Sequence, residues 1–175
     1  MIDLPSLGKQ KAIRPVGICL HAMAEYLDLS PFDQHAYEFL KAQGLGAHYL
    51  ITPSGDTLNC ADPTEMCYHA KGFNRWEGTR GDVGLIGIEI LVPGCHTYGS
   101  FTDAIKEPGW CGMGQWHETV ELVKALKEEY DLKLWLKDGR TYPWLVRHSD
   151  ISPGRKVDPG AGFDYQAMRK ATAGL

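Results

Sequence analysis

The sequence lacks three features that would place it in a special class of protein. No apolar run approaches the roughly 18 residues that cross a bilayer, so we expect no membrane anchor. Basic residues are in the minority, with 18 Lys and Arg against 22 Asp and Glu, and the formal net charge is -4. Nucleic acid is therefore not expected as a partner, because phosphate binding draws on a surplus of positive charge. The N-terminus has no apolar signal core, so we expect a protein made in the cytoplasm without a signal peptide.

Cysteine is scarce and irregularly spaced, and no CxxC pair is present. We expect reduced, partly buried thiols, because a disulfide framework normally uses an even number of regularly placed cysteines. A metal site built from Cys60, Cys67 and His69 is an alternative, but this spacing matches no zinc finger. The five cysteines are Cys19, Cys60, Cys67, Cys95 and Cys111.

Repeats, low-complexity tracts and linkers are also missing, so residues 1–175 are expected to form a single catalytic domain and to act as a monomer. A content of 43% hydrophobic residues is sufficient for a normal core. Residues 93–113, rich in glycine, proline and aromatics, predict a long loop. The interleaving of strands and helices predicts an α/β fold with a central mixed β-sheet flanked by helices. Apolar patterns predict strands at residues 16–22, 47–51, 57–59, 83–91 and 144–147, and helices at 31–43, 115–130 and 165–172.

The strand predicted at residues 83–91 carries a carboxylate among apolar residues. Its sequence, VGLIGIEIL, is apolar on both alternating faces, which is typical of a central strand covered on both sides. Burying Glu89 there is costly unless something compensates its charge. Two interpretations are open: an ion pair with Arg or Lys, or an acid/base residue whose pKa is raised by loss of water.

Three further polar residues suggest a metal site. His21 ends the first predicted strand, where a core histidine with satisfied hydrogen bonds is the more common interpretation. In VRHSDISPGRKVDPG, turn-forming Pro-Gly pairs can bring His148 and Asp158 together. Zinc accepts imidazole and carboxylate ligands, and three protein ligands with one open position are typical of a catalytic site. Lys156 would then lie near the metal and could stabilise an oxyanion.

These segments together resemble a known enzyme family. VRHSDISPGRKVDPGAGFDY is similar to the C-terminal signature of the zinc amidases that include N-acetylmuramoyl-L-alanine amidases and peptidoglycan recognition proteins. GICLHAM, GAHYLITPSGD, YHAKGFN and LIGIEI resemble earlier segments of that family in the same order, so the resemblance covers residues 16–165. It implies a peptidoglycan recognition protein-like amidase fold with a zinc-floored groove. It also implies cleavage of the amide bond between the lactyl group of N-acetylmuramic acid and L-alanine in peptidoglycan or muropeptides.

The resemblance assigns roles to five residues. His21, His148 and Asp158 match the family's three zinc ligands, which implies one Zn2+ per chain. Glu89 matches the acid that activates the attacking water, and Lys156 matches the residue that steadies the tetrahedral intermediate.

Four other residues are weaker candidates for contact with the substrate. His69, in YHAKGFN, either contacts substrate near the metal or organises its own loop. His48 either lies near the metal or belongs to the core. Asn74 and Arg75 are candidates for binding the stem peptide, because Arg can pair with a carboxylate through two hydrogen bonds.

Two branches of the family differ at informative positions. Phage lytic amidases typically have Tyr before the His48 position, Cys as the third ligand and no acid in the LIGIEI strand. Here Ala47, Asp158 and Glu89 are closer to the cytoplasmic amidases that recycle anhydro-muropeptides, whereas HAKGFN is more like the phage enzymes. We expect a phage or prophage endolysin that acts on the cell wall, with a recycling amidase as the alternative. An alternative of another class is a non-catalytic peptidoglycan-binding protein, although such proteins typically lack the metal ligands.

Overall fold

A mixed β-sheet forms the centre of the protein, as the sequence predicts. The computed structural model describes residues 1–29, 31–70, 84–137 and 140–173. Within these ranges the sheet has seven strands in the order β1-β5-β4-β6-β2-β3, with β9 beside β2, and β7 and β8 form a separate pair. The strands are β1 (Ile2–Asp3), β2 (Gly17–Leu29), β3 (Phe32–His35), β4 (Tyr49–Ile51), β5 (Thr57–Asn59), β6 (Leu85–His96), β7 (Trp135–Lys137), β8 (Arg140–Tyr142) and β9 (Leu145–Arg147).

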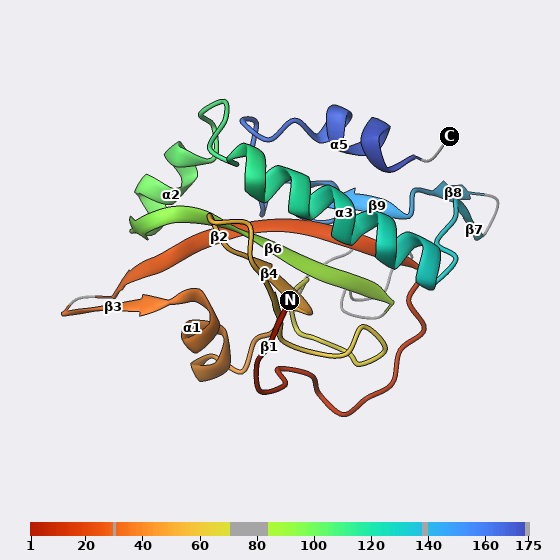
Figure 1. Cartoon of the computed structure of the whole chain (residues 1–175), viewed down its shortest axis with the longest axis horizontal. Coiled ribbons are helices and arrows are strands. Elements are labelled where there is room, and N and C mark those ends of the chain that lie inside the picture. The colour runs from red at the N-terminus through yellow and green to blue at the C-terminus, as the bar shows by residue number, and fades with distance from the viewer. Residues whose placement is uncertain (30, 71–83, 138–139, 174–175) are drawn as a thin grey trace.

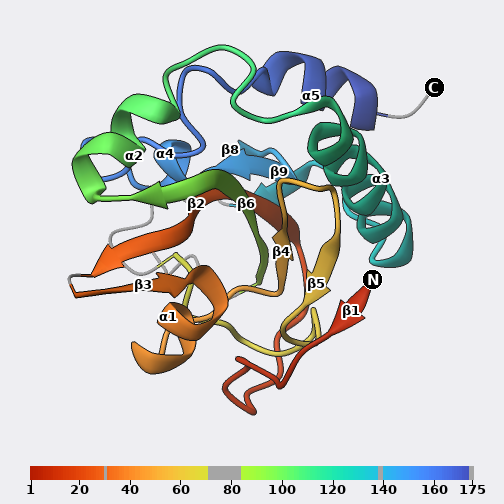
Figure 2. The same cartoon turned by 60° about the vertical axis from the view of Figure 1, so that its left-hand side comes forward.

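Helices cover both faces of this sheet. The helices are α1 (Ala36–Ala42), α2 (Tyr98–Ala104), α3 (Met113–Glu129), α4 (His148–Ile151) and α5 (Tyr165–Thr172). α3 and α5 lie over one face, and α1 lies against the other (Figures 1 and 2). No helix of the described ranges is both long enough and apolar enough to cross a membrane.

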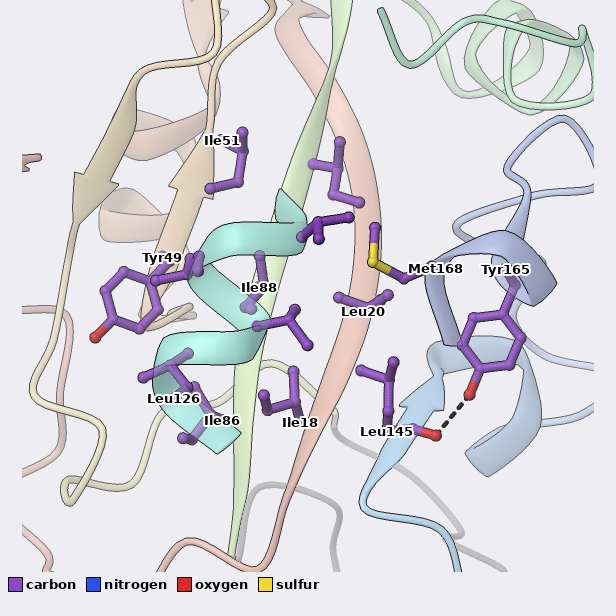
Figure 3. Packing of buried hydrophobic residues seen from close by; sticks show 14 of the residues in the cluster. Ile18, Leu20, Tyr49, Ile51, Ile86, Ile88, Leu126, Leu145, Tyr165 and Met168 are labelled. Carbon is purple, nitrogen blue, oxygen red and sulfur yellow. Dashed lines mark hydrogen bonds between the residues drawn. The ribbon is translucent and has the colours of Figure 1, made fainter. Parts of the chain in front are cut away.

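The main core lies between the sheet and the pair α3 and α5. Side chains alternate between the two faces of a strand, so every second residue of β2 and β6 points toward these helices. Figure 3 shows Ile18 and Leu20 of β2 beside Ile86 and Ile88 of β6, with Met168 of α5 packed over them. The hydroxyl of Tyr165 donates to the carbonyl of Leu145 and so ties α5 to β9 (Figure 3). The intervening residues of β2 and β6 therefore point to the opposite face, where α1 packs.

The predicted helix at residues 31–43 is wrong in its first part. Strand β2 continues to Leu29 and pairs antiparallel with β3, so residues 32–35 are extended. α1 begins only after His35, whose ring Nδ1 accepts a hydrogen bond from the backbone N–H of Tyr37. Gly44 follows the helix with a φ of 62°, as expected of a glycine that ends a helix. Ser30, the predicted cap, lies outside the described residues.

The predicted loop at residues 93–113 is also wrong in part. β6 continues to His96 alongside β2, and α2 follows at once, with the hydroxyl of Thr97 accepting from the N–H of Ser100. Pairing with a neighbouring strand stabilises a segment whose glycine and proline content favours a loop. The predicted hairpin of β4 and β5 and the helices α3 and α5 are confirmed.

Candidate active site

A row of polar residues crosses three parallel strands on the face opposite α3 and α5. His21 of β2 pairs in register with Glu89 of β6, and Leu20 pairs with Arg147, the last residue of β9. His148 follows Arg147, so it comes into line with His21 on the other side of β2. Residues in register across parallel strands point to the same face. The sheet itself therefore brings His148, His21 and Glu89 together, although they lie far apart in the sequence.

Three potential ligand atoms converge at this row. His21 Nδ1 lies 2.8 Å from His148 Nδ1 and 3.4 Å from Asp158 Oδ2, and the distance from His148 Nδ1 to Asp158 Oδ2 is 3.0 Å. All three side chains are buried. This group could hold a metal ion, which is the combination that the sequence predicts.

The electrostatics favour the protonation states that a metal requires. Burial, and then the electrostatic interaction with His148, lowers the pKa of His21 to about 4, so this ring is neutral near pH 7. Burial opposes the ionisation of Asp158, but its hydrogen bond with His148 and the closeness of His21 outweigh it and hold the pKa of Asp158 below its usual range. A neutral imidazole and an ionised carboxylate are the forms that bind metal ions.

Glu89 lies beside this group, with Oε1 3.9 Å from His21 Nδ1. Loss of water on burial, followed by the nearby charge of Asp158, raises the pKa of Glu89 to about 8. Its Oε2 is buried and has no hydrogen-bond partner among the described residues. The alternative of a structural ion pair is not supported, because the first causes of the shift are burial and a second carboxylate.

The loop after β9 delivers the remaining groups. The N–H of Ser149 donates to the carbonyl of Asp158, and the N–H of Lys156 donates to the carbonyl of Ser152, so the loop closes on itself. Lys156 is half-buried on the wall of the pocket that also contains Glu89 and Asp158. This segment therefore places the cation of Lys156 and the carboxylate of Asp158 on the wall of the same pocket.

His69 lies behind the ligand group. Its Nδ1 is 2.9 Å from His21 Nε2, and its Nε2 is 3.0 Å from the carbonyl oxygen of Leu85. Cys19, His21 and His69 form a second group with converging ligand atoms. Cys19 is fully buried and is not on the pocket wall, whereas His148 and Asp158 are, so the group of His21, His148 and Asp158 fits a catalytic metal better. Cys60, Cys67 and His69 do not converge in this way within the described ranges.

His48 has a different environment from the other candidate residues. Its Nε2 donates to the carbonyl of Glu65, 2.8 Å away, and its Nδ1 accepts from the N–H of Gly87 at the same distance. It is fully buried and is absent from the pocket wall. This placement favours the core interpretation. The other two candidates for substrate binding, Asn74 and Arg75, lie outside the described residues.

A pocket of about 540 Å³ opens beside the ligand group. Its volume is in the range typical of small-molecule sites. His148, Glu89 and Lys156 contribute polar atoms to the wall. Apolar side chains from β2, α1 and α2 line much of the remainder, among them Leu27, Leu29, Phe39, Tyr98 and Phe101.

The sequence reasoning did not single out Arg155. Its Nη2 donates to the hydroxyl of Ser152, 2.9 Å away, and lies 3.3 Å from His148 Nε2. Arg155 is exposed, and its position next to Lys156 is the sequence signal that could have indicated it. With Lys156 it makes this side of the pocket basic.

Comparison with known proteins now identifies the family. The sequence model of the family described as N-acetylmuramoyl-L-alanine amidase matches residues 11–161. The chain belongs to this family. A curated relative, the 1,6-anhydro-N-acetylmuramyl-L-alanine amidase AmpD of Haemophilus influenzae, is 30% identical to this amidase-family chain over 122 residues. The match covers 70% of the chain and 55% of the relative, so the chain spans about half of the length of that protein.

Solved structures share the fold of this amidase-family chain. N-acetylmuramoyl-L-alanine amidase LysC from Clostridium intestinale superposes with a TM-score of 0.66 at 17% identity, over 99% of this chain and 97% of LysC. AmiD from E. coli, an N-acetylmuramyl-L-alanine amidase in complex with anhydro-N-acetylmuramic acid-L-Ala-D-gamma-Glu-L-Lys, gives a TM-score of 0.64 at 22% identity. That match covers 95% of this chain and 61% of AmiD. These likenesses confirm the predicted amidase fold, with its mixed sheet and flanking helices.

Proposed function

We propose that this chain hydrolyses the amide bond between the lactyl group of N-acetylmuramic acid and L-alanine, using one Zn2+ held by His21, His148 and Asp158. The observation that carries the proposal is the convergence of two imidazole nitrogens and a carboxylate oxygen beside Glu89, at the wall of a pocket. We also propose that residues 1–175 act as one catalytic domain and as a monomer.

The three side chains fit zinc in both chemistry and spacing. Tetrahedral zinc, with bonds of about 2.0 to 2.1 Å, separates its ligand atoms by roughly 3.3 Å. The separations found here are 2.8, 3.0 and 3.4 Å. Two imidazoles and one carboxylate leave a fourth position for substrate or water, as in catalytic zinc sites. When bound, zinc would supply a Lewis acid that polarises the scissile carbonyl and makes water more acidic.

Glu89 is suited to move the proton. It would accept a proton from the attacking water and deliver it to the nitrogen of the departing L-alanine. A pKa of about 8 for the metal-free site is close to neutral, which suits a group that must both take and give a proton. Glu89 also lines the pocket beside the ligand group, which supports this role because its carboxyl group is within reach of a bound substrate.

Lys156 and the apolar wall are suited to bind and stabilise the substrate. The ammonium group of Lys156 would stabilise the negative charge that develops on the carbonyl oxygen. Arg155 adds a second cation on the same loop, which suits a peptide that carries carboxylates. The side chains of Leu27, Phe39 and Phe101 suit the methyl groups of the lactyl and alanyl units.

The test measures metal content and hydrolysis together. Purified wild-type protein is expected to contain about one zinc per chain and to release L-alanine peptides from muropeptides. The His148→Ala variant is expected to lose both properties. A zinc content far below one per chain, with no hydrolysis after zinc is added, would favour a non-catalytic peptidoglycan-binding protein instead.

For the biological role we propose cell-wall lysis, as an endolysin, on the basis of the segment HAKGFN. The recycling of anhydro-muropeptides is a second candidate, favoured by the residues Glu89 and Asp158 and by the similarity to the Haemophilus influenzae 1,6-anhydro-N-acetylmuramyl-L-alanine amidase. Hydrolysis rates on intact sacculi and on soluble anhydro-muropeptides separate the two. A strong preference for the soluble anhydro form would rule out the lytic role.

A further inference from the structure

We infer that His69 is a positioning residue that fixes the tautomer of His21, so that the unprotonated Nδ1 of His21 faces the metal. The inference rests on the proposed function, because it concerns how one proposed zinc ligand is held. It concerns a hydrogen-bonded series that runs from the backbone of β6, through His69, to His21.

The donors and acceptors in this series of hydrogen bonds are fixed because the series ends at a carbonyl oxygen. The carbonyl oxygen of Leu85 can only accept, so the proton between it and His69 must be on His69 Nε2. His69 is buried, and its neighbours among the described residues are the rings of His21 and His48 and this carbonyl, so within that part of the chain no carboxylate pairs with it to balance a second proton. Its Nδ1 is therefore an acceptor. His21 must then donate from Nε2, which leaves a lone pair on Nδ1.

Gly87 makes room for this arrangement. A side chain at position 87 would place its Cβ 2.5 Å from Cγ of His69 and 2.8 Å from Nδ1, closer than atoms can approach. The same residue donates its N–H to His48, which packs edge-on against His69 with ring centroids 5.7 Å apart. A glycine in the middle of a buried central strand is unfavourable on its own, so the space that it gives to the His69 ring accounts for its presence.

The second histidine of the ligand group is held differently. The outer nitrogen of His148, Nε2, lies 3.3 Å from the guanidinium of Arg155, which can only donate. Within the described ranges, no acceptor on that side selects the tautomer that leaves Nδ1 unprotonated. His21 is therefore the histidine whose ligand atom is prepared in advance, and His69 is the residue that prepares it.

Zinc affinity provides the first test. The dissociation constant of each variant is measured by competition with a chromophoric chelator. We expect His69→Leu to bind zinc about 10 to 100 times more weakly, the usual effect of removing a hydrogen-bond partner of a ligand histidine. His69→Gln should recover most of the affinity, because its amide offers an acceptor to His21 and a donor to Leu85. Gln115→Leu is the matched control, since Gln115 is buried and donates to the carbonyls of Ile51 and Leu91, away from the ligand group.

The tautomer itself provides the second test, and it needs no metal. Nitrogen-15 chemical shifts of the His21 ring in the metal-free protein distinguish a protonated from an unprotonated nitrogen. The wild type should show a proton on Nε2, and His69→Leu should show a mixture of both tautomers. A proton on Nδ1 of His21 in the wild type would overturn the inference.

The two proposals fail in different ways. If the wild type binds zinc and His69→Leu binds it equally well, the role of His69 is wrong and the hydrolase proposal stands. If the wild type binds no zinc, the proposed function fails and this inference fails with it. Loss of affinity in Gln115→Leu as large as in His69→Leu would show that general destabilisation is responsible, and would also overturn the inference.

Discussion

Replacing Glu89 by Gln should make the metal-free protein more stable near neutral pH while it strongly lowers the rate of hydrolysis. Glu89 is 8% exposed, and one of its oxygens has no hydrogen-bond partner among the described residues. Burial and the charge of Asp158 raise its pKa from 4.5 to about 8. A carboxyl group whose pKa is higher in the folded state favours unfolding when it ionises. Its charge therefore opposes folding above pH 4.5.

The size of this effect follows from the two pKa values. Below pH 4.5 the group is protonated in both states and costs nothing. Above it, each unit of pH costs about 1.4 kcal/mol until the folded-state pKa near 8 is reached, so the cost at pH 7 is about 3 kcal/mol. The amide of Gln must itself be buried, and an unsatisfied donor costs about 1 to 3 kcal/mol. The net gain is therefore greatest at pH 8 and is absent at pH 4.

Urea unfolding of the metal-free proteins at pH 5 and pH 8 measures this difference. The stability of Glu89→Gln relative to the wild type should rise between these two values of pH. Glu128→Gln removes an exposed carboxyl group on α3 and should show no such rise. Turnover of the zinc-loaded Glu89→Gln enzyme should fall by about 10² to 10⁴, the usual contribution of a general base. A relative stability that does not change with pH, or a turnover near that of the wild type, would refute the reasoning.

Three further perturbations have definite expected outcomes. Lys156→Met should lower kcat by about 10² to 10³ while the zinc content by metal analysis stays at the wild-type level, and a loss of zinc would contradict its assigned role. Burial lowers the pKa of His48 from 6.5 to about 4, so the stability of the wild type falls as the pH drops through this range. His48→Gln should remove about 2 kcal/mol of that loss at pH 5, measured by urea unfolding. If the free energy of unfolding of the variant decreased on acidification as much as that of the wild type, this prediction would be contradicted. Leu20→Ala should lower the free energy of unfolding by about 3 kcal/mol, because Leu20 is fully buried beneath α5, and a loss below 1 kcal/mol would show that the core collapses around the gap.

The centre of the fold was predictable from the sequence because its signals are local. A short window of sequence is enough to predict the apolar run of β6, the hairpin of β4 and β5, and the amphipathic helix α3. The proximity of His21 and His148 was also within reach, since both are placed at the ends of predicted strands. Predicting that Asp158 joins these two histidines required the family resemblance, because residue spacing alone does not show how a turn-rich segment folds back.

The remaining features depend on contacts that a short window of the sequence does not show. Residues 32–35 form a strand only because β2 extends to meet them, and a local pattern does not contain that extension. In the sequence, His69 cannot be distinguished from a histidine that binds the metal. Its role depends on the hydrogen bond to the carbonyl of Leu85 and on the space left by the missing side chain of Gly87. The glycine inside LIGIEI was the available signal, because a glycine in a central strand indicates close approach of another group.

The self-closing loop after β9 has a consequence for how such a site can change. β9 pairs with β2 only at residues 18–20 and β3 only at residues 26–29, so no described strand occupies this edge of β2 between them. The segment from His148 to Asp158, which begins with α4, contacts this part of β2 through the pairs His148–His21 and Asp158–His21, and it is held by its own backbone hydrogen bonds. Two proposed ligands and the proposed oxyanion-stabilising lysine thus lie on one continuous segment, which could be replaced as a unit. Exchange of this single segment would give the enzyme a different third ligand, or none, and leave the β-ladder untouched.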